Sequence, residues 1–480
     1  MAITSASQTR AAAVQQTLSD NYLDIQNNGW AQQYLPDLME KEAEVFGKRT
    51  ISGFLAQVGA EEAMSADQVV WSEQGRLHLS YKGTVGTHTT STIQLDTDID
   101  GNDVGTTHGV RVGDTVLIAS AALTVRAFVS QINSDTNGDQ NTGATDFITA
   151  IPYDAEHLDN SGFGTNDPVT ILVYGSEHSK GTTGKVGANE PSFTSFTNKP
   201  IIMKDMYQVS GSDASQVGWV EVSGEDGQNG YMWYLKAEGD TRSRFADYTE
   251  MALVEAEKAA DASTILGGAN GLVGTEGLFS AISNRGHQTS GVTGVNAATD
   301  LAEFDAILAE FDKNGAIEEN MLFLNRATSL AFDDMLASMN SYGAGGTSYG
   351  VFDNNEDMAL NLGFSGFRRG SYDFYKSDWK YLNDLSTRGG INERNATGAI
   401  RGVVIPAGTS SVYDEQLGKN LKRPFLHVRY RASQTESRKM KTWITGSVGA
   451  VTSDLDAMTV NFLTERCLVV QAANNFMLMN

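Results

Sequence analysis

Residues 239–268 read GDTRSRFADYTEMALVEAEKAADASTILGG, and this stretch decides the fold. Its apolar positions recur every three or four residues, as expected for one face of a helix: Phe245, Tyr248, Ala252, Ala256 and Ala259. Asp240 or Thr241 is suited to cap the start, and Gly267-Gly268 to end it. We therefore predict one long helix over 239–268, whose small alanine face can pack closely against a sheet.

Strand-like sequence precedes this helix. VVWSEQGRLHLSY (69–81) has a glycine turn followed by strict alternation, with Leu77, Leu79 and Tyr81 on one face, which predicts a β-hairpin arm. Residues 84–190 are rich in Gly, Thr, Asp and Asn and carry short strand-like runs. They predict a small all-β domain with 4 basic and 14 acidic residues, inserted into a longer hairpin that resumes at 191–238.

After the helix, residues 269–420 alternate helices and strands. Asp300 and Glu303 have the spacing of a capping box, a helical stripe follows, and Gly315 is placed to end that helix. MLFL (321–324) predicts a short buried strand before a second helix, and GSYDFYKSDWKYL (370–382) predicts a further strand. Residues 421–480, which include KTWITG (441–446), read as antiparallel strands that end the chain inside a sheet. The fold class is therefore α+β.

The N-terminal residues 1–50 predict an arm. Leu35-Pro36 interrupts the segment, and Asp37 could cap a short helix after it. A frayed terminus is the simpler alternative, but Trp30 and Tyr34 are costly to leave in water. We expect the arm to dock on another surface, such as a neighbouring subunit.

Composition excludes several classes of protein. The 480 residues include 35 basic and 59 acidic ones, a net charge of −24, which disfavours a dedicated DNA-binding protein. The single Cys467 cannot form an intrachain disulfide. No secretory leader is evident, and no run of about eighteen apolar residues predicts a membrane span.

Motifs for catalysis are missing from the sequence. There is no HExxH, no CxxC and no histidine pair at helical spacing, and GTTGKV (181–186) lacks the Ser or Thr of a phosphate loop. GFSG (363–366) is one residue short of a nucleophile elbow. We therefore assign no catalytic, cofactor-binding or metal-binding residue and expect that the chain is not an enzyme.

One stretch has the pattern of a calcium loop. Asp96, Asp98, Asp100 and Gly101 match its first half, but Thr107 stands where the twelfth-position acid belongs. A second set has the oxygens but Gln140 in place of the glycine: Asp135, Asn137, Asp139 and Asp146. Asp and Asn also gather in plain turns, where they bond their own backbone, and we favour that interpretation.

A basic block interrupts the acidity. Between residues 419 and 441 only Glu436 opposes eight basic residues: Lys419, Lys422, Arg423, Arg429, Arg431, Arg438, Lys439 and Lys441. Two interpretations stay open, a subunit-contact strip that pairs with acidic surface and a patch that faces phosphate. We favour the contact strip because Pro424, Phe425, Leu426 and Val428 make this stretch strand-like.

The order of these predicted elements resembles that of the major capsid proteins of tailed bacteriophages with the HK97-like fold. The amino-acid sequence itself is most similar to those of crAss-like phage capsid proteins. Five stretches carry the likeness: KPIIMKDMYQVSG (199–211), FADYTEMALVEAEKAAD (245–261), MLFLNRATSLAFDDML (321–336), RGVVIPAG (401–408) and TERCLVVQAANNF (464–476). The likeness divides the chain into an N-arm (1–50), the start of the P-domain and first E-loop strand (51–83), an inserted β-domain (84–190), the E-loop return strand (191–238), a spine helix (239–268), an A-domain (269–420) and a P-domain sheet (421–480). The inserted β-domain departs from the simplest members of the family.

This resemblance implies self-assembly into an icosahedral shell of hexamers and pentamers around packaged double-stranded DNA, which the shell touches weakly and without sequence specificity. Its arms exchange between subunits, so we expect the arm residues Trp30, Tyr34, Trp71 and Tyr81 to contact a neighbouring subunit. It also implies a place in the virion, assembly in the host bacterial cytoplasm, no membrane, and other capsid, portal and auxiliary or decoration proteins as partners. The alternative is a phage tail or baseplate protein, or another β-rich structural surface protein. An enzyme is a third and weaker alternative, because the sequence offers no convergent titratable residues.

Overall fold

A computed structural model describes residues 53–55, 60–87, 90–104, 108–132, 147–185, 193–212, 222–223, 229–230, 232–260, 263–267, 271–341, 366–395, 397–407, 409–414, 419–447 and 451–480. The chain divides into two compact units. The smaller unit comprises Met1–Phe54, Met203–Met251 and Met440–Thr464. The larger unit comprises Leu55–Ile202, Ala252–Lys439 and Glu465–Asn480. The predicted arm, with Trp30 and Tyr34, lies outside the described residues.

Most of one long helix and three strands build the smaller unit. The helix is α3 (Met232–Glu255), and the strands are β10 (Ile201–Ser210), β21 (Lys441–Gly446) and β22 (Ala457–Val470). β21 pairs antiparallel with β22, and β10 lies on the other side of β22. Phe245 of α3 packs on Val460 and Phe462 of β22, which gives the unit its core.

The helix differs from its predicted bounds at both ends. Asp240 and Thr241 lie inside α3 and do not cap it, and the Thr241 hydroxyl donates to the carbonyl of Ala237 one turn earlier. The helix ends at Glu255 because the chain beyond it bonds to residues 273–277: Ala259 N donates to Val273 O, and Gly277 N donates to Ala256 O. Of the predicted stripe, Phe245 is buried and Tyr248 is exposed. Only a four-residue helix, α4 (Thr264–Gly267), remains of the predicted C-terminal part.

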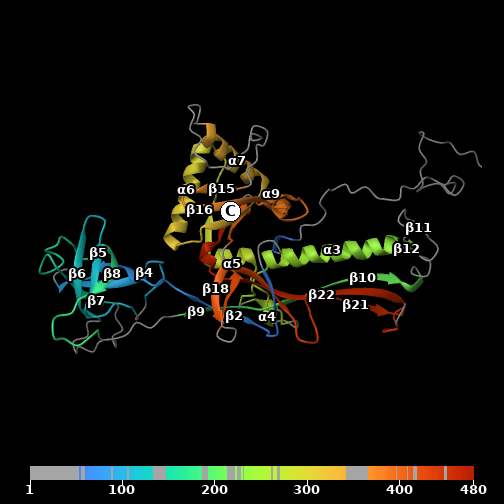
Figure 1. The fold of residues 1–480 in the computed structure, drawn as a ribbon, viewed down its shortest axis with the longest axis horizontal. Coiled ribbons are helices and arrows are strands. Elements are labelled where there is room, and N and C mark those ends of the chain that lie inside the picture. The colour runs from blue at the N-terminus through green and yellow to red at the C-terminus, as the bar shows by residue number, and fades with distance from the viewer. Residues whose placement is uncertain are drawn as a thin grey trace, which may run out of the picture. The chain divides into compact units, whose positions relative to one another are not determined.

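Six strands of the larger unit close into a barrel in the order β3-β4-β7-β6-β5-β8 (Figure 1). Their bounds are β3 (Ser80–Val85), β4 (Thr92–Asp98), β5 (Asp114–Ala119), β6 (Thr124–Ile132), β7 (Phe147–Pro152) and β8 (Pro168–Ser176). Alternate side chains point inward and form one core, with Ile93, Leu95 and Ile118 fully buried. Gly83 lies at a bulge of β3, where a Cβ would collide with the carbonyl oxygen of Gln94.

The hairpin predicted over 69–81 is wrong. β2 (Val69–Gln74) pairs antiparallel with β9 (Phe193–Asn198), so a two-stranded ribbon flanks the barrel in sequence. Residues 80–85 belong to the barrel, and Leu77 is exposed in the connection. Trp71 and Tyr81, expected on an arm that needs another subunit, are buried by their own chain.

Helices α5 (Leu278–Arg285) to α9 (Arg388–Arg394) accompany a six-stranded sheet of order β13-β23-β17-β14-β16-β15. The sheet comprises β13 (His287–Thr289), β14 (Glu319–Leu324), β15 (Gly366–Arg369), β16 (Tyr372–Asp378), β17 (Gly402–Pro406) and β23 (Met477–Met479). Helices α6 (Ala297–Asn314) and α7 (Arg326–Ser341) bury Phe304 and Phe332 against Phe374 of β16. A four-residue helix, α8 (Lys380–Asn383), replaces the end of a predicted strand.

The predicted capping box of α6 is wrong, although the helix itself is present. Asn296 is the cap, because its side chain accepts from the amides of Ala298 and Thr299. Asp300 accepts instead from the amide of Gly294. Gly315 does end the helix in the left-handed conformation, at φ 59°.

The C-terminal strands belong to two different sheets. β20 (Leu426–Arg431) pairs antiparallel with residues 466–470 of β22 and parallel with β1 (Ala60–Met64). β23, expected in the closing antiparallel sheet, pairs parallel with β13 and antiparallel with β17. Short two-stranded ribbons form from β18 (Thr409–Asp414) with β19 (Lys419–Pro424), and from β11 (Val222–Ser223) with β12 (Asn229–Gly230). Within the described part of the chain, no helix combines the length and apolarity that crossing a membrane requires.

Candidate functional site

The basic block extends from β19 through β20 to the start of β21, and four of its side chains, on β20 and the segment after it, bind acids of the same chain. β1 runs parallel to β20 in a register that sets Glu62 beside Arg429. Arg429 binds the Glu62 carboxylate at 2.7 Å, and both side chains are more than two-thirds buried. Glu62 of β1 therefore neutralises Arg429 of the neighbouring strand β20.

Further ion pairs extend this arrangement. The carboxylate of Glu465 on β22 forms ion pairs with Arg438 at 2.5 Å and with Arg431 at 3.6 Å. Arg431 also binds Asp67. Glu61 binds both Lys439 and Arg466. The hydrogen bond from Arg431 holds the pKa of Asp67 below its usual value, and the same bond raises the pKa of Arg431.

These contacts correct the prediction for the block. Of its eight basic residues, Arg429, Arg431, Arg438 and Lys439 pair with acids of their own chain, where the sequence suggested pairing with a second subunit. Lys441 lies 5.8 Å from the Trp443 ring centroid, in the range of a cation–π contact. The side chains of Lys419, Lys422 and Arg423 lie outside the described ones.

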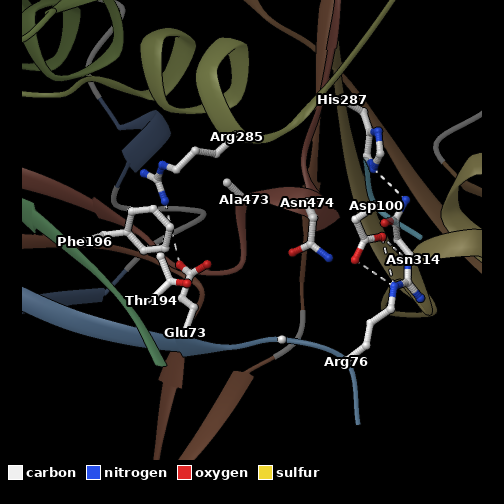
Figure 2. A pocket seen from close by; sticks show the side chains of 11 residues that line it. Glu73, Arg76, Asp100, Thr194, Phe196, Arg285, His287, Asn314, Ala473 and Asn474 are labelled. Carbon is white, nitrogen blue, oxygen red and sulfur yellow. Dashed lines mark hydrogen bonds and ion pairs between the residues drawn. The ribbon is translucent and has the colours of Figure 1, made fainter. Parts of the chain in front are cut away.

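A polar pocket of about 540 Å³ lies beside the β2–β9 ribbon (Figure 2). Its lining residues come from the ribbon, the barrel turn after β4, α5, β13, the end of α6 and the 3₁₀ turn before β23: Glu73, Gly75, Arg76, Asp100, Thr194, Phe196, Arg285, His287, Asn314, Ala473 and Asn474. No sequence motif connects these segments, so the pocket is a product of tertiary structure.

Arg285 forms one wall of the pocket and reaches toward the ribbon (Figure 2). Its guanidinium binds Glu276 at 2.7 Å and approaches Glu73 at 3.7 Å. The same group lies over the rings of Phe196 and Trp71, at 4.6 and 5.6 Å from their centroids. Two carboxylates and two aromatic faces therefore hold this cation in place.

The opposite wall joins the barrel to α6 (Figure 2). Arg76 donates from Nε to the Asp100 carboxylate at 2.9 Å and from a terminal nitrogen to the carbonyl of Lys313 at 2.9 Å. Asn314 lies 2.9 Å from His287 Nε2. Because the amide of Asn314 donates, the His287 ring accepts at Nε2 in this arrangement. The charged side chains that line the pocket thus pair with one another, Arg76 with Asp100 and Arg285 with Glu73.

The structure does not gather the predicted calcium ligands. Asp98 accepts from the backbone and side chain of Asn102 in the turn after β4, and Asp100 binds Arg76. Among the described residues, no group of three or more His, Cys, Asp or Glu side chains is placed to hold a metal ion. The second set, Asp135 to Asp146, lies outside the described residues.

Sequence reasoning missed Arg285, Glu276 and Arg76. The only local signal was a basic residue at the end of an apolar helix, which is an ordinary feature of helices. Cys467, by contrast, was noted only as unpaired, and the structure buries it completely in β22. Burial raises the pKa of its thiol to about 12.

No family model matches the chain, and no curated protein does. Among solved structures, a chain from Microbacterium phage Oxtober96 is similar with a TM-score of 0.37 and 9% identity, covering 94% of this chain and 97% of the other. A chain from the capsid structure of the cyanophage P-SCSP1u has a TM-score of 0.41 and 8% identity, covering 96% and 95%. A chain from the capsid of a native GTA particle has a TM-score of 0.36 and 11% identity, covering 94% and 98%. Phage capsids are thus among the solved structures that this chain resembles.

Proposed function

We propose that this chain is the major capsid protein of a tailed bacteriophage, and that many copies assemble into an icosahedral shell enclosing packaged double-stranded DNA. One observation carries the proposal. The smaller unit leaves Met206 of β10, Tyr248 of α3 and Ile444 of β21 each more than half exposed. Among the described residues of this unit the core cluster around Phe245 is small, so the unit gains stability when such side chains are covered by other copies.

The order of elements supports the same function. A ribbon that flanks a barrel, a 24-residue helix over antiparallel strands, a sheet with helices, and closing strands follow one another along the chain. In an HK97-like arrangement these are the E-loop, the spine helix, the A-domain near 269–420 and the P-domain sheet, with the barrel as an inserted domain. Hexamers and pentamers would form around the A-domain, and a crAss-like origin stays a prediction.

Extended parts make such a shell stable without any single strong contact. A ribbon such as β2–β9 can lie across a neighbouring subunit, so that buried area accumulates over several partners. Closed symmetry then repeats each weak contact many times. The shell is then stable as a whole, although each contact between two subunits is weak.

The charge distribution suits a container for DNA. The chain carries a net −24, and Arg429, Arg431, Arg438 and Lys439 already bind carboxylates of their own chain. These four cations are therefore already neutralised within the chain, and a weakly interacting wall allows DNA to be packed past it.

Substitution at the exposed face of β10 tests the proposal. Met206→Glu places a charge where another copy is expected to pack, so sedimentation should find subunits in place of shells. Met206→Leu keeps an apolar side chain of similar volume and should assemble like the parent. Full assembly of Met206→Glu would contradict the proposal, because the exposed face of β10 would then not be a contact between copies.

A further inference from the structure

The outer surface of the barrel carries an apolar face across four neighbouring strands, β7, β6, β5 and β8. Its exposed or partly exposed side chains are Leu117, Phe128, Ile151, Leu172 and Tyr174. Strand register places them side by side: Phe128 is opposite Ile151, and Leu117 is opposite Leu172. We call these five residues, with Tyr153 and Arg126, the barrel face.

The barrel face is held in shape by a hydrogen bond between residues that follow its two outermost strands. The Tyr153 hydroxyl donates to Glu177 at 2.5 Å, although Tyr153 follows β7 and Glu177 follows β8. Tyr153 and Tyr174 are each 53% exposed, so neither side chain belongs to the core of the barrel. The ring of Tyr153 is thus fixed before any partner arrives, which lowers the entropy cost of binding.

Charge is distributed unevenly around the barrel. Residues 80–176 contain 3 basic and 12 acidic residues, a net −9. On the outward positions of the described strands β5 to β8, the one charged side chain is Arg126, which is opposite Leu117. Glu177 places an acid at the border of the face. The face therefore combines an apolar centre with a cation, Arg126, and a bordering anion, Glu177.

We propose that the barrel face binds the same face of a second copy of this chain about a twofold axis. A surface with one cation and one anion beside an apolar centre is complementary to itself, because Arg126 of each copy can meet Glu177 of the other. Elsewhere on the barrel the acidic surfaces repel one another, and screening over about 8 Å at physiological salt limits that repulsion. Aromatic and aliphatic side chains at the centre supply the burial that stabilises the contact.

The inference rests on the proposed function in one respect, since a shell brings many copies of the barrel close together. It goes beyond that function because the contacts proposed above, at the smaller unit, the A-domain and the ribbon, do not involve the barrel face. The barrel contact would then be a second, separable connection between subunits. Its presence and the presence of shells can be measured independently in one sample.

Disulfide trapping of the full chain tests the contact. The parent chain has one cysteine, Cys467, which is buried and therefore silent. Ile151→Cys and Leu172→Cys, alone and as an equal mixture, are oxidised with copper phenanthroline under assembly conditions. We expect covalent dimers on a non-reducing gel. Asp96→Cys, exposed on β4 outside the face, is the matched control and should stay monomeric.

The outcomes separate the two claims. Dimers from the face variants but not from the control support the contact, whether or not electron microscopy finds shells in the same sample. Shells without dimers overturn the contact and leave the capsid function standing. Equal dimer yields from all variants, or face cysteines that stay fully open to a soluble thiol reagent, also overturn it.

Discussion

Arg285 lies with its guanidinium carbon 4.6 Å from the centroid of the Phe196 ring while it binds Glu276 at 2.7 Å. The arginine ends α5, and the phenylalanine belongs to β9 of the ribbon. The exposed fractions of the Arg285 and Glu276 side chains are 15% and 13%, so water screens the pair weakly. This single side chain therefore fixes the base of the ribbon to the region that carries the six-stranded sheet.

Replacement of Arg285 by Met should loosen the ribbon. The change leaves Glu276 and Glu73 without their shared cation, and breaking a largely buried pair costs about 3 kcal/mol. Hydrogen exchange measured by mass spectrometry should show faster exchange in 69–74 and 193–198. Lys313→Met removes the exposed pair with Glu310 and is the control, at about 0.5 kcal/mol. Unchanged exchange in the ribbon would contradict the assigned role.

Exchange of the charges of Glu62 and Arg429 tests the neutralised basic block. Arg429→Glu sets two acids together in a mostly buried place and should lower the free energy of unfolding by about 3 kcal/mol. Adding Glu62→Arg restores opposite charges and should recover a large part of that loss. Thermal unfolding of the two single variants and the double variant measures the coupling. Simple additivity would mean that the two residues do not interact.

The Tyr372 phenol predicts an alkaline loss of stability. Burial first, and then its hydrogen bond to Asp312, raise its pKa from 10.0 to about 12. The folded state holds this proton more tightly, so its contribution is complete below about pH 10 and falls as pH rises to about 12. Tyr372→Phe should be less stable than the parent at pH 8 by about 1 kcal/mol, and the deficit should shrink at pH 11.

Tyr375→Phe on the same strand is the control, because this tyrosine is exposed. Denaturant unfolding at both pH values gives the comparison for the two variants. A deficit of Tyr372→Phe that stays constant from pH 8 to pH 11 would rule out linkage through this phenol.

Cys467 should be unreactive in the folded chain. It is completely buried, and its thiol pKa is raised to about 12, so almost no thiolate exists at pH 8. A chromogenic disulfide reagent should release no product from the native protein and one equivalent after unfolding in guanidinium. Rapid reaction of the native protein with this reagent would show that Cys467 is accessible. Cys467 could then form disulfides of its own in the trapping experiment.

Local signals were sufficient where the chain decides its own conformation. Gly315 was identified as a helix end because only a residue without a Cβ adopts the left-handed region easily, and it does so at φ 59°. KTWITG was identified as a strand and forms one with the same bounds, Lys441–Gly446. Periodicity and turn chemistry act within a few residues, so one sequence contains them.

Features that depend on distant segments could not be predicted. Trp71 was expected to face a neighbour, but its strand pairs with β9 far along the chain and buries it. Thr241 looked like a cap because polar residues favour helix starts, yet the helix continues through it. The acids that neutralise Arg429 and Lys439 lie on β1, which only the parallel register with β20 brings near.

Negative-stain electron microscopy of the full chain, expressed alone in bacteria, tests the capsid role most directly. The account predicts closed shells, or hexamer and pentamer rings that convert into shells when salt is lowered or a crowding agent is added. A stable monomer or trimer with no higher assembly under any of these conditions would contradict it.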